Sequence, residues 1–140
     1  MVKINYYIIF LFLLSCIPQI NNKKYSKDYN IEREYYSTGT LQYETSYQYG
    51  KLEGFSKSWN IDGKLISKVH YKDGFIHGIW ETYYDSGQIK NITYYVRGEK
   101  HGKETWYHRN GIKQSEIYYI NDKIDSKILR WDETGKQIIN

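Results

Sequence analysis

The sequence has little of several things on which other classes of protein depend. Its 140 residues include one cysteine, one proline and one methionine, and a single cysteine excludes an intramolecular disulfide framework. The apolar run at residues 6–14 is nine residues long, well short of the roughly 20 that a membrane-spanning helix needs. The 20 basic and 16 acidic residues, with a net charge of +4, form no long block of one sign. Such a pattern is typical of a solubilised surface, and we expect no nucleic acid partner.

Tyrosine and glycine are what the sequence has instead. It contains 17 tyrosines and 11 glycines, and its mean hydropathy is -0.76. A chain of this length forms one domain at most. The bias toward tyrosine is typical of a half-exposed β-sheet and does not suit a thick aliphatic core.

All eleven glycines follow a repeat of 24 residues. The first series has an aromatic residue four positions before each glycine, and its members are Gly39, Gly63, Gly87, Gly111 and Gly135. Two further series keep the same period: Gly50, Gly74 and Gly98, and Gly54, Gly78 and Gly102. Self-similarity of this kind predicts a tandem array. Because an array uses nearly the whole chain to build one continuous surface, we expect a binding protein and not an enzyme.

Each repeat is predicted to be a β-hairpin. In the clearest unit, two runs rich in aromatic and β-branched residues flank a turn at 85–87. Directly opposed residues of an antiparallel pair share a face, so pairing Tyr83 with the apolar Ile89 leaves an odd number of residues in the loop. A three-residue loop that ends with Gly87 in the left-handed conformation satisfies this pairing. The glycines of the first series are therefore predicted to be turn residues.

The hairpin also predicts the faces and the ends of its strands. Side chains alternate between the two faces of a strand. Four residues of the second strand are therefore predicted to share the face of Tyr83: Ile89, Asn91, Thr93 and Tyr95. The segment 98–102 is expected to connect one hairpin to the next. In the last repeat Asp122 and Ser126 replace the two glycines of that connection, which predicts a C-terminal cap. Two strands per repeat give about ten strands in one all-β, elongated, twisted antiparallel sheet of stacked hairpins.

The N-terminal residues are predicted to be an export signal and not part of the fold. The apolar run has the length of a signal-peptide core, and the motif that follows it resembles a bacterial lipobox: Leu13-Leu14-Ser15-Cys16. In such motifs the cysteine thiol is lipidated before cleavage. Leu14 stands where a small residue is usual, and a plain secretory signal with an incidental cysteine is the alternative. The expected division is a signal peptide at 1–15, a lipidated flexible tether at 16–31 and the repeat array at 32–140.

The repeat resembles the MORN repeat. The resemblance is carried by the spacing of the glycines with Tyr, Trp, Leu and Ile between them, and residues 74–89 are its best single example. More closely, residues 35–139 are similar to the variant found in bacterial proteins of the YwqK antitoxin family. The resemblance implies stacked β-hairpins that associate with a protein or a membrane. It does not imply one biochemical activity, because MORN arrays occur in scaffolds, in membrane-contacting proteins and beside catalytic domains.

No catalytic or metal site is expected. His77 and His101 occupy the same position in successive repeats, so they lie two strands, about 10 Å, apart, which is too far for two ligands of one zinc ion. The sequence has no serine in a nucleophile elbow and no phosphate-binding glycine loop. We expect no cofactor and no small-molecule substrate. A glycosylation sequon at 91–93 is discounted, because a lipobox indicates a bacterial protein.

Partner contacts are expected from aromatic residues that the repeat does not require: Phe55, Phe75, Trp80 and Trp106. Aromatic side chains are enriched where proteins bind one another. We expect a non-enzymatic, lipid-anchored protein of the cell envelope that binds another protein through its array and the membrane through Cys16. The alternative is an antitoxin or immunity protein of the YwqK type that neutralises a toxin, and a toxin-like neighbouring gene would favour it.

The lipobox leads to a direct prediction. Changing Cys16 to Ser removes the thiol that accepts the lipid, so the variant should leave the membrane fraction when cells are fractionated. If Cys16→Ser stays in that fraction as firmly as the wild type, the lipoprotein interpretation is wrong.

Overall fold

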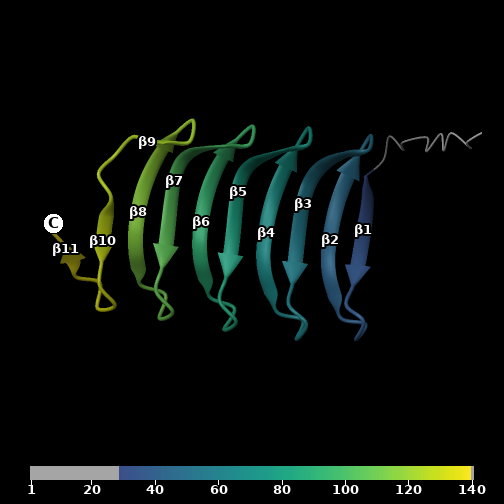
Figure 1. Ribbon diagram of the computed structural model, residues 1–140, viewed down its shortest axis with the longest axis horizontal. Coiled ribbons are helices and arrows are strands. Elements are labelled where there is room, and N and C mark those ends of the chain that lie inside the picture. The colour runs from purple at the N-terminus through teal and green to yellow at the C-terminus, as the bar shows by residue number, and fades with distance from the viewer. Residues whose placement is uncertain (1–28, 140) are drawn as a thin grey trace, which may run out of the picture.

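The computed structural model describes residues 29–139, which form one open antiparallel sheet without a helix (Figure 1). The predicted signal peptide, Cys16 and most of the predicted tether lie outside the described residues. Strand order follows the chain, so nearly every strand pairs with the strands before and after it. The predicted all-β sheet of hairpin repeats is confirmed. Within residues 29–139 no helix is long and apolar enough to cross a membrane.

Eleven strands form the sheet. Their bounds are β1 Asn30–Tyr35, β2 Leu41–Gln48, β3 Lys51–Trp59, β4 Leu65–Lys72, β5 Phe75–Tyr83, β6 Ile89–Val96, β7 Glu99–Tyr107, β8 Lys113–Ile120, β9 Lys123–Ile124, β10 Leu129–Trp131 and β11 Gln137–Ile138. The first strand begins at Asn30, within the segment expected to be a tether. Moving β7 forward by one repeat of 24 gives 123–131, the span of β9 and β10 together. The ten strands expected from the repeat therefore appear as eleven, because the ninth is interrupted and forms the two short strands β9 and β10.

The turns at one end of the sheet are three-residue loops. In the hairpin of β5 and β6, the Tyr84 amide donates to the Gln88 carbonyl over 2.9 Å, and the Gly87 amide donates to the Tyr84 carbonyl over 2.8 Å. Gly87 has a φ of 85°, and Tyr83 pairs with Ile89. The geometry is a type I turn followed by a left-handed glycine. The same two hydrogen bonds close the loops that end at Gly39, Gly63, Gly111 and Gly135.

The prediction that residues 91, 93 and 95 share the face of Tyr83 is wrong. Thr82 pairs with Asn91, whereas the next residue, Tyr83, pairs with Ile89. Because Thr82 and Tyr83 point to opposite faces, Asn91 lies on the face opposite to Tyr83, and the residues at 93 and 95 share the face of Asn91. Period-two counting failed because a β-bulge after Ile89 adds one residue to the strand.

The connections at the other end are shorter than predicted. Arg97 (φ 52°) and Gly98 (φ 90°) alone connect β6 to β7, and positive φ at both central residues defines a type I′ turn. The rest of the predicted connection lies in β7, where Gly102 has a φ of 111° beside a shift in register. A Cβ at Gly102 would lie 3.2 Å from the Cβ of Tyr94, so a side chain there would be both strained and crowded.

The last repeat ends the regular pattern. Asn121 and Asp122 keep the positive φ of the two-residue turn, at 49° and 63°. Where the full repeats have a glycine in the bulge, Ser126 lies in an interruption between β9 and β10. The C-terminal edge therefore consists of strands of two or three residues, too short to offer a long row of unpaired backbone groups.

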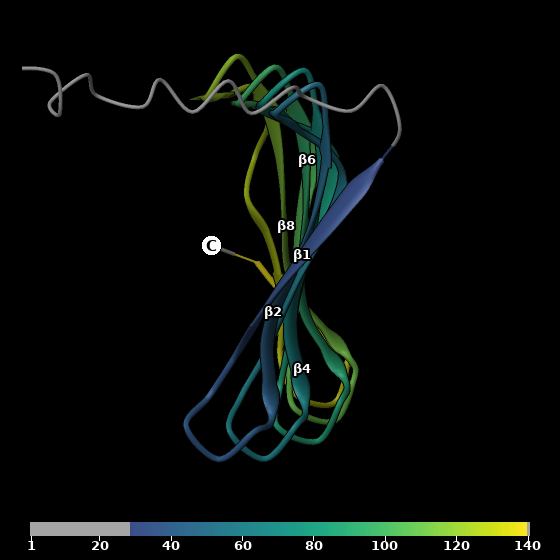
Figure 2. The ribbon, with the colours of Figure 1, turned by 90° about the vertical axis from the view of Figure 1, so that its right-hand side faces the viewer.

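The sheet is a single twisted layer, and nothing in residues 29–139 covers either face (Figure 2). Among these residues Val69, at 8% exposed, is the one buried apolar side chain. The repeated aromatics Trp59, Tyr83 and Tyr107 are half-buried. Cross-strand contacts of roughly 0.2–1 kcal/mol per pair must therefore supply much of the stability.

A side-chain hydrogen bond also joins successive hairpins. The Tyr36 hydroxyl donates to the Trp59 carbonyl over 2.9 Å, and the Tyr84 hydroxyl donates to the Tyr107 carbonyl over 2.7 Å. His108 makes the equivalent bond to the Trp131 carbonyl over 2.9 Å. Each bond spans 23 residues, so it connects the turn of one repeat to the strand of the next.

Turn geometry predicts which substitutions destabilise the array. A Cβ at Gly87 would meet nothing within 4 Å, so Gly87→Val should lower the free energy of unfolding through backbone strain alone, by about 1–3 kcal/mol. The exposed neighbour Gln88 is the control, and Gln88→Lys should change stability by less than about 0.5 kcal/mol. Gly87→Asn should fall between them, because Asn tolerates the left-handed region. Equal shifts in melting temperature for all three variants would contradict the turn assignment.

Candidate functional site

Two consecutive residues of β4 define the faces of the sheet. Val69 and His70 point to opposite sides, and we name the two surfaces the Val69 face and the His70 face. Phe55 pairs with His70, and Trp80 pairs with Val69. Directly opposed residues share a face, so Phe55 and Trp80 lie on opposite sides of the sheet.

The four predicted contact residues are divided between the two faces. Phe55 and Phe75 lie on the His70 face, since Phe75 pairs with Lys72, two residues after His70. Their exposed fractions are 44% and 55%. Both are available to a partner on the His70 face.

Trp80 and Trp106 are half-buried on the Val69 face. The Trp80 indole donates to the Ser67 hydroxyl over 2.8 Å, and its ring centroid lies 5.9 Å from that of Tyr95. Trp80 is thus held in place by its neighbours. Trp80 therefore supports the sheet although the repeat does not require a tryptophan at this position. The repeat pattern alone did not indicate this role.

Exposed apolar side chains form a row across the His70 face, from β3 to β8. We call this set of residues the apolar row. Its members are Phe55, Ile79, Tyr94 and Tyr118, which are 44%, 39%, 41% and 43% exposed. Cross-strand pairing brings them together: Phe55 pairs with His70, Ile79 with Tyr94, and Lys103 with Tyr118. The Phe55 ring meets His70 edge-on, with centroids 5.0 Å apart.

Three members of the apolar row were missed from the sequence. Tyr94 and Tyr118 are 24 residues apart and occupy the same position in their repeats. Each directly precedes one of the repeated tyrosines, Tyr95 and Tyr119, and the prediction attended to those. The doublet of tyrosines was the available signal, because neighbouring residues of a strand face opposite sides.

Ion pairs border the apolar row on the same face. The Glu44 carboxylate lies between Arg33 of β1, at 2.8 Å, and Lys57 of β3, at 3.3 Å. The hydrogen bond from Arg33, helped by Lys57, holds the pKa of Glu44 below its ordinary value. Further along, the Lys68 ammonium lies 3.3 Å from the Glu81 carboxylate. These charges are largely compensated, so this part of the face is polar without a strong excess of either sign.

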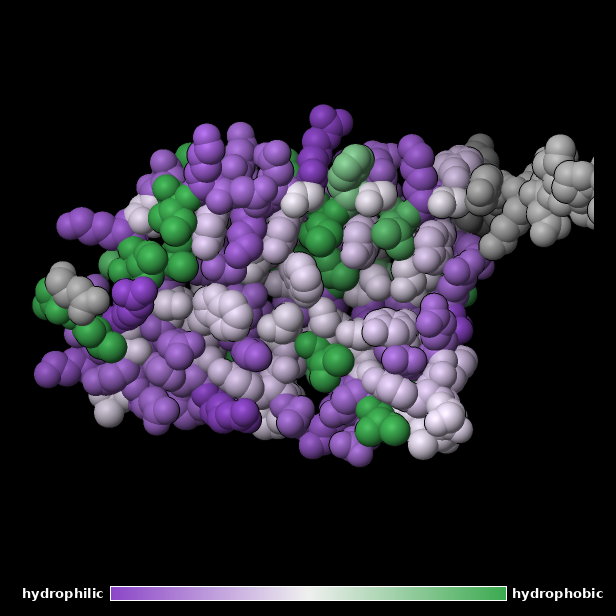
Figure 3. Space-filling view, in the orientation of Figure 1, coloured by the Kyte–Doolittle hydropathy of each residue, from purple (hydrophilic) through white to green (hydrophobic). Residues whose placement is uncertain are grey.

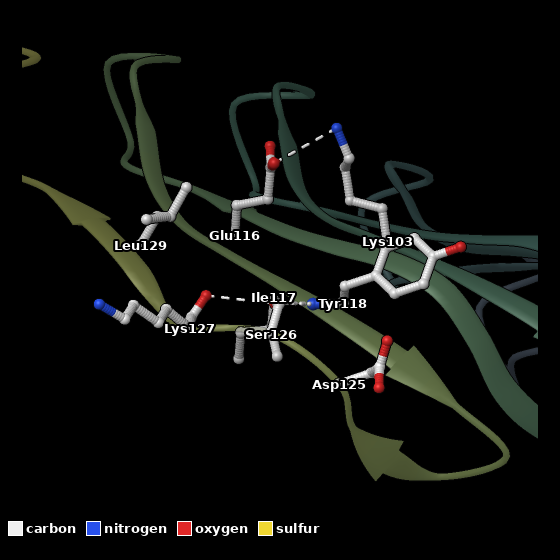
Figure 4. A pocket seen from close by; sticks show the side chains of 8 residues that line it. All are labelled: Lys103, Glu116, Ile117, Tyr118, Asp125, Ser126, Lys127 and Leu129. Carbon is white, nitrogen blue, oxygen red and sulfur yellow. Dashed lines mark hydrogen bonds and ion pairs between the residues drawn. The ribbon is translucent and has the colours of Figure 1, made fainter.

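At its C-terminal end the apolar row meets a pocket of about 460 Å³ (Figure 4). The pocket lies beside the interruption between β9 and β10, and Lys103, Glu116 and Tyr118 contribute to its wall. Glu116 accepts ion pairs from Lys113, at 2.6 Å, and from Lys103, at 3.3 Å. The Lys113 hydrogen bond lowers the pKa of Glu116. The carboxylate is thus charged at neutral pH and fully engaged by its own chain.

The Val69 face contains a buried polar network around Glu104. This carboxylate, 6% exposed, accepts hydrogen bonds from Lys100 at 2.7 Å, Tyr119 at 3.2 Å and Thr93 at 3.3 Å. Burial alone would lower the pKa of Lys100, but the bond to Glu104 outweighs it, and the pKa is raised. Asn91 completes the network through a bond to the Thr105 carbonyl over 3.1 Å, so the amide of the glycosylation sequon is buried.

The network departs from the repeat. One repeat earlier, Ile76 and Trp80 occupy the positions of Lys100 and Glu104. In the described part of the chain, no buried side-chain polar atom lacks a hydrogen-bond partner, and no group of three metal-ligating residues occurs. The polar groups on this face bind one another, and the arrangement supports a structural role.

Removal of the central carboxylate should therefore be costly. Glu104→Ala leaves the Lys100 ammonium and the Tyr119 hydroxyl without this acceptor, while the Thr93 hydroxyl keeps its bond to Asn91. We expect the free energy of unfolding to fall by about 1–3 kcal/mol. The exposed Glu99 on the same strand is the control, and Glu99→Ala should cost less than about 0.5 kcal/mol. Chemical denaturation measures both. If both variants lose less than about 0.5 kcal/mol of unfolding free energy, the network does not stabilise the fold.

Similarity to a known family of repeats agrees with this architecture. Three stretches match the MORN repeat variant: residues 29–49, 76–97 and 100–121. They correspond to the hairpins of β1 with β2, β5 with β6 and β7 with β8. No curated protein matches the chain. The MORN repeat is in general a non-catalytic module, and this protein contains the MORN repeat variant at three of its repeats.

Proposed function

We propose that this protein is a non-enzymatic binding module that holds a protein partner on its His70 face, at the cell envelope, with Cys16 as its lipid anchor. The observation that carries the proposal is the apolar row, four large apolar side chains about two-fifths exposed on a sheet face that no described residue covers. Tyr and Phe are residue types that protein interfaces favour.

The shape of the row suits a protein and not a small molecule. The row crosses six strands, so at about 4.8 Å per strand it is roughly 24 Å long. On the face drawn in Figure 3, apolar residues form separate spots among polar ones. The four side chains of the row, each about two-fifths exposed, offer a partner several moderate contacts, and the ion pairs beside the row would orient that partner.

The proposed location at the cell envelope rests on the lipobox. MORN repeats serve as modules that bind proteins or membranes, and a lipid on Cys16 would leave the array itself available for a protein. A toxin is one possible class of partner. A toxin encoded beside the gene, tested in the assay below, would distinguish this antitoxin role from a general scaffold.

Photo-crosslinking in cells tests the proposal. A benzophenone amino acid at Tyr94 should crosslink a partner, whereas the same probe at Tyr43 should not. Tyr43 is the matched control because it is equally exposed, at 42%, but pairs with Ser58 on the Val69 face. Mass spectrometry of the crosslinked band identifies the partner.

The identified partner then allows a quantitative test. Tyr94→Thr should weaken its binding by about 1–2 kcal/mol, roughly five- to thirtyfold, and Tyr43→Thr should leave it unchanged. Melting of both variants confirms that the sheet is intact. Equal weakening by the two substitutions, or none by Tyr94→Thr, would remove the His70 face as the binding surface.

A further inference from the structure

The pocket at the C-terminal end of the apolar row exists because a serine replaces a glycine of the repeat. Gly78 and Gly102 form the bulges of β5 and β7 with φ of 95° and 111°, and Ser126 occupies the same position one repeat later. A positive φ is costly for serine, and Ser126 does not adopt one. The chain leaves the sheet here, and the pocket of about 460 Å³ opens between it and β8 (Figure 4).

The loop that bounds the pocket is held by its own hydrogen bonds. The Asp125 amide donates to the Tyr118 carbonyl over 2.8 Å. The Tyr118 amide donates to the Ser126 hydroxyl over 3.0 Å, and that hydroxyl donates to the Lys127 carbonyl over 3.2 Å. The pocket is therefore a feature of the folded backbone. A ligand does not have to order this loop, which lowers the entropic cost of binding.

The interior repeats show which chemistry the pocket lacks. Ile117 occupies the position that Val69 and Thr93 hold in earlier repeats, and those two side chains are 8% and 3% exposed. Ile117 itself is only half-buried, because the strand beside it is interrupted. Leu129, which also lines the pocket, is 36% exposed. The walls thus include apolar side chains that gain stability when an apolar group covers them.

Charges around the pocket indicate what should flank that apolar group. Lys113, at 2.6 Å, and Lys103, at 3.3 Å, share a single carboxylate, that of Glu116. Lys127 forms no ion pair with a described residue. At this site three lysines therefore stand against two carboxylates, Glu116 and Asp125. The excess of positive charge favours an occupant with carboxylates beside its apolar group.

A second copy of the chain fits this site less well than an acidic partner does. In a two-fold symmetric dimer the same surface lies on both sides of the interface. A dimer centred on the pocket would bring two positively charged rims together, which is unfavourable. The charge around the pocket thus selects a different protein.

We propose that this pocket binds an aromatic side chain of the partner protein, in a segment where carboxylates flank the aromatic residue. The ring lies between Ile117 and Leu129, beside the ring of Tyr118, and aromatic pairs are favourable. The flanking carboxylates lie near Lys103 and Lys127. The proposal rests on the proposed function, because it identifies one anchor of the same partner, but its first test does not need that partner.

Three capped tripeptides are the probes, each titrated into the full chain in detergent. Acetyl-Glu-Phe-Glu-amide should shift the methyl NMR signals of Ile117 and Leu129 saturably, and its ring should show nuclear Overhauser contacts to them. Acetyl-Glu-Ala-Glu-amide keeps the charge but lacks the ring, and acetyl-Lys-Phe-Lys-amide keeps the ring but reverses the charge. Both should bind at least about tenfold more weakly.

Filling the pocket tests its location. Leu129→Trp places a large side chain in the pocket and should weaken Glu-Phe-Glu binding at least about tenfold. Ile124 is the matched control, because it lies on β9 and is 54% exposed but does not line the pocket. Ile124→Trp should leave the affinity unchanged. The melting temperatures of both variants show whether the sheet is intact.

Charge variants test the flanking contacts in opposite directions. Lys127→Glu should weaken Glu-Phe-Glu binding at least about twofold, and Asp125→Asn should strengthen it by about two- to fivefold, the range of one exposed ion pair. Unchanged affinity in both variants would remove the acidic flanks from the proposal.

Further results would overturn the proposal. Equal affinity for the Phe and Ala peptides would exclude an aromatic anchor, and undiminished binding to Leu129→Trp would place the peptide elsewhere. A dimer in sedimentation that Leu129→Trp dissociates would identify a second copy as the occupant.

The pocket and the apolar row can fail separately. Leu129→Trp should also weaken binding of the protein identified by crosslinking at Tyr94, at least about fivefold. Unchanged partner binding in this variant would overturn the pocket and leave the row standing. Absence of any crosslink at Tyr94, with tripeptide binding as expected, would overturn the row and leave the pocket standing.

Discussion

Hydrogen-bonded pairing between neighbouring strands is the interaction on which the rest of this structure depends. A single-layer sheet has no core that could hold its elements together from a distance, and Val69 is the one buried apolar side chain among residues 29–139. Each hairpin is therefore stabilised by the hairpins on either side, as in other repeat proteins. The left-handed glycines set the register of the pairing, and the hydroxyl of Tyr36 or Tyr84 ties one turn to the next strand.

Strict repetition of the turns leaves the faces free to vary. Lys100 and Glu104 occupy the positions that Ile76 and Trp80 hold one repeat earlier, so two apolar residues are replaced by two members of a buried polar network. The exchange is possible because Thr93, Asn91 and Tyr119 provide hydrogen-bond partners at the same level of the sheet. A buried polar network is stable only when all of its members are satisfied. The third full repeat thus differs from its neighbours in chemistry but not in backbone geometry.

The proposed contact surface follows from the open architecture of the sheet. A face that no described residue covers leaves Phe55, Ile79 and Tyr94 accessible in a row, because cross-strand pairing places them side by side. Among residues 29–139, β1 pairs with a strand on one side alone, because an open sheet must end somewhere. The two ends are treated differently: β1 has six residues, whereas the C-terminal edge is reduced to short strands around Ser126.

The sequence by itself determined the repeat, the all-β hairpin fold and the three-residue turns, because a glycine at every 24th residue reports a local backbone conformation. The faces were decided only by the tertiary structure. The bulge after Ile89 reverses the side on which Asn91 lies, and the two-residue turn at Arg97 and Gly98 makes β7 longer than expected. Bulges depend on how one strand fits the next, and no spacing within a single strand reveals them. For the same reason the division of Phe55 from Trp80, and the assembly of the apolar row, required the paired strands.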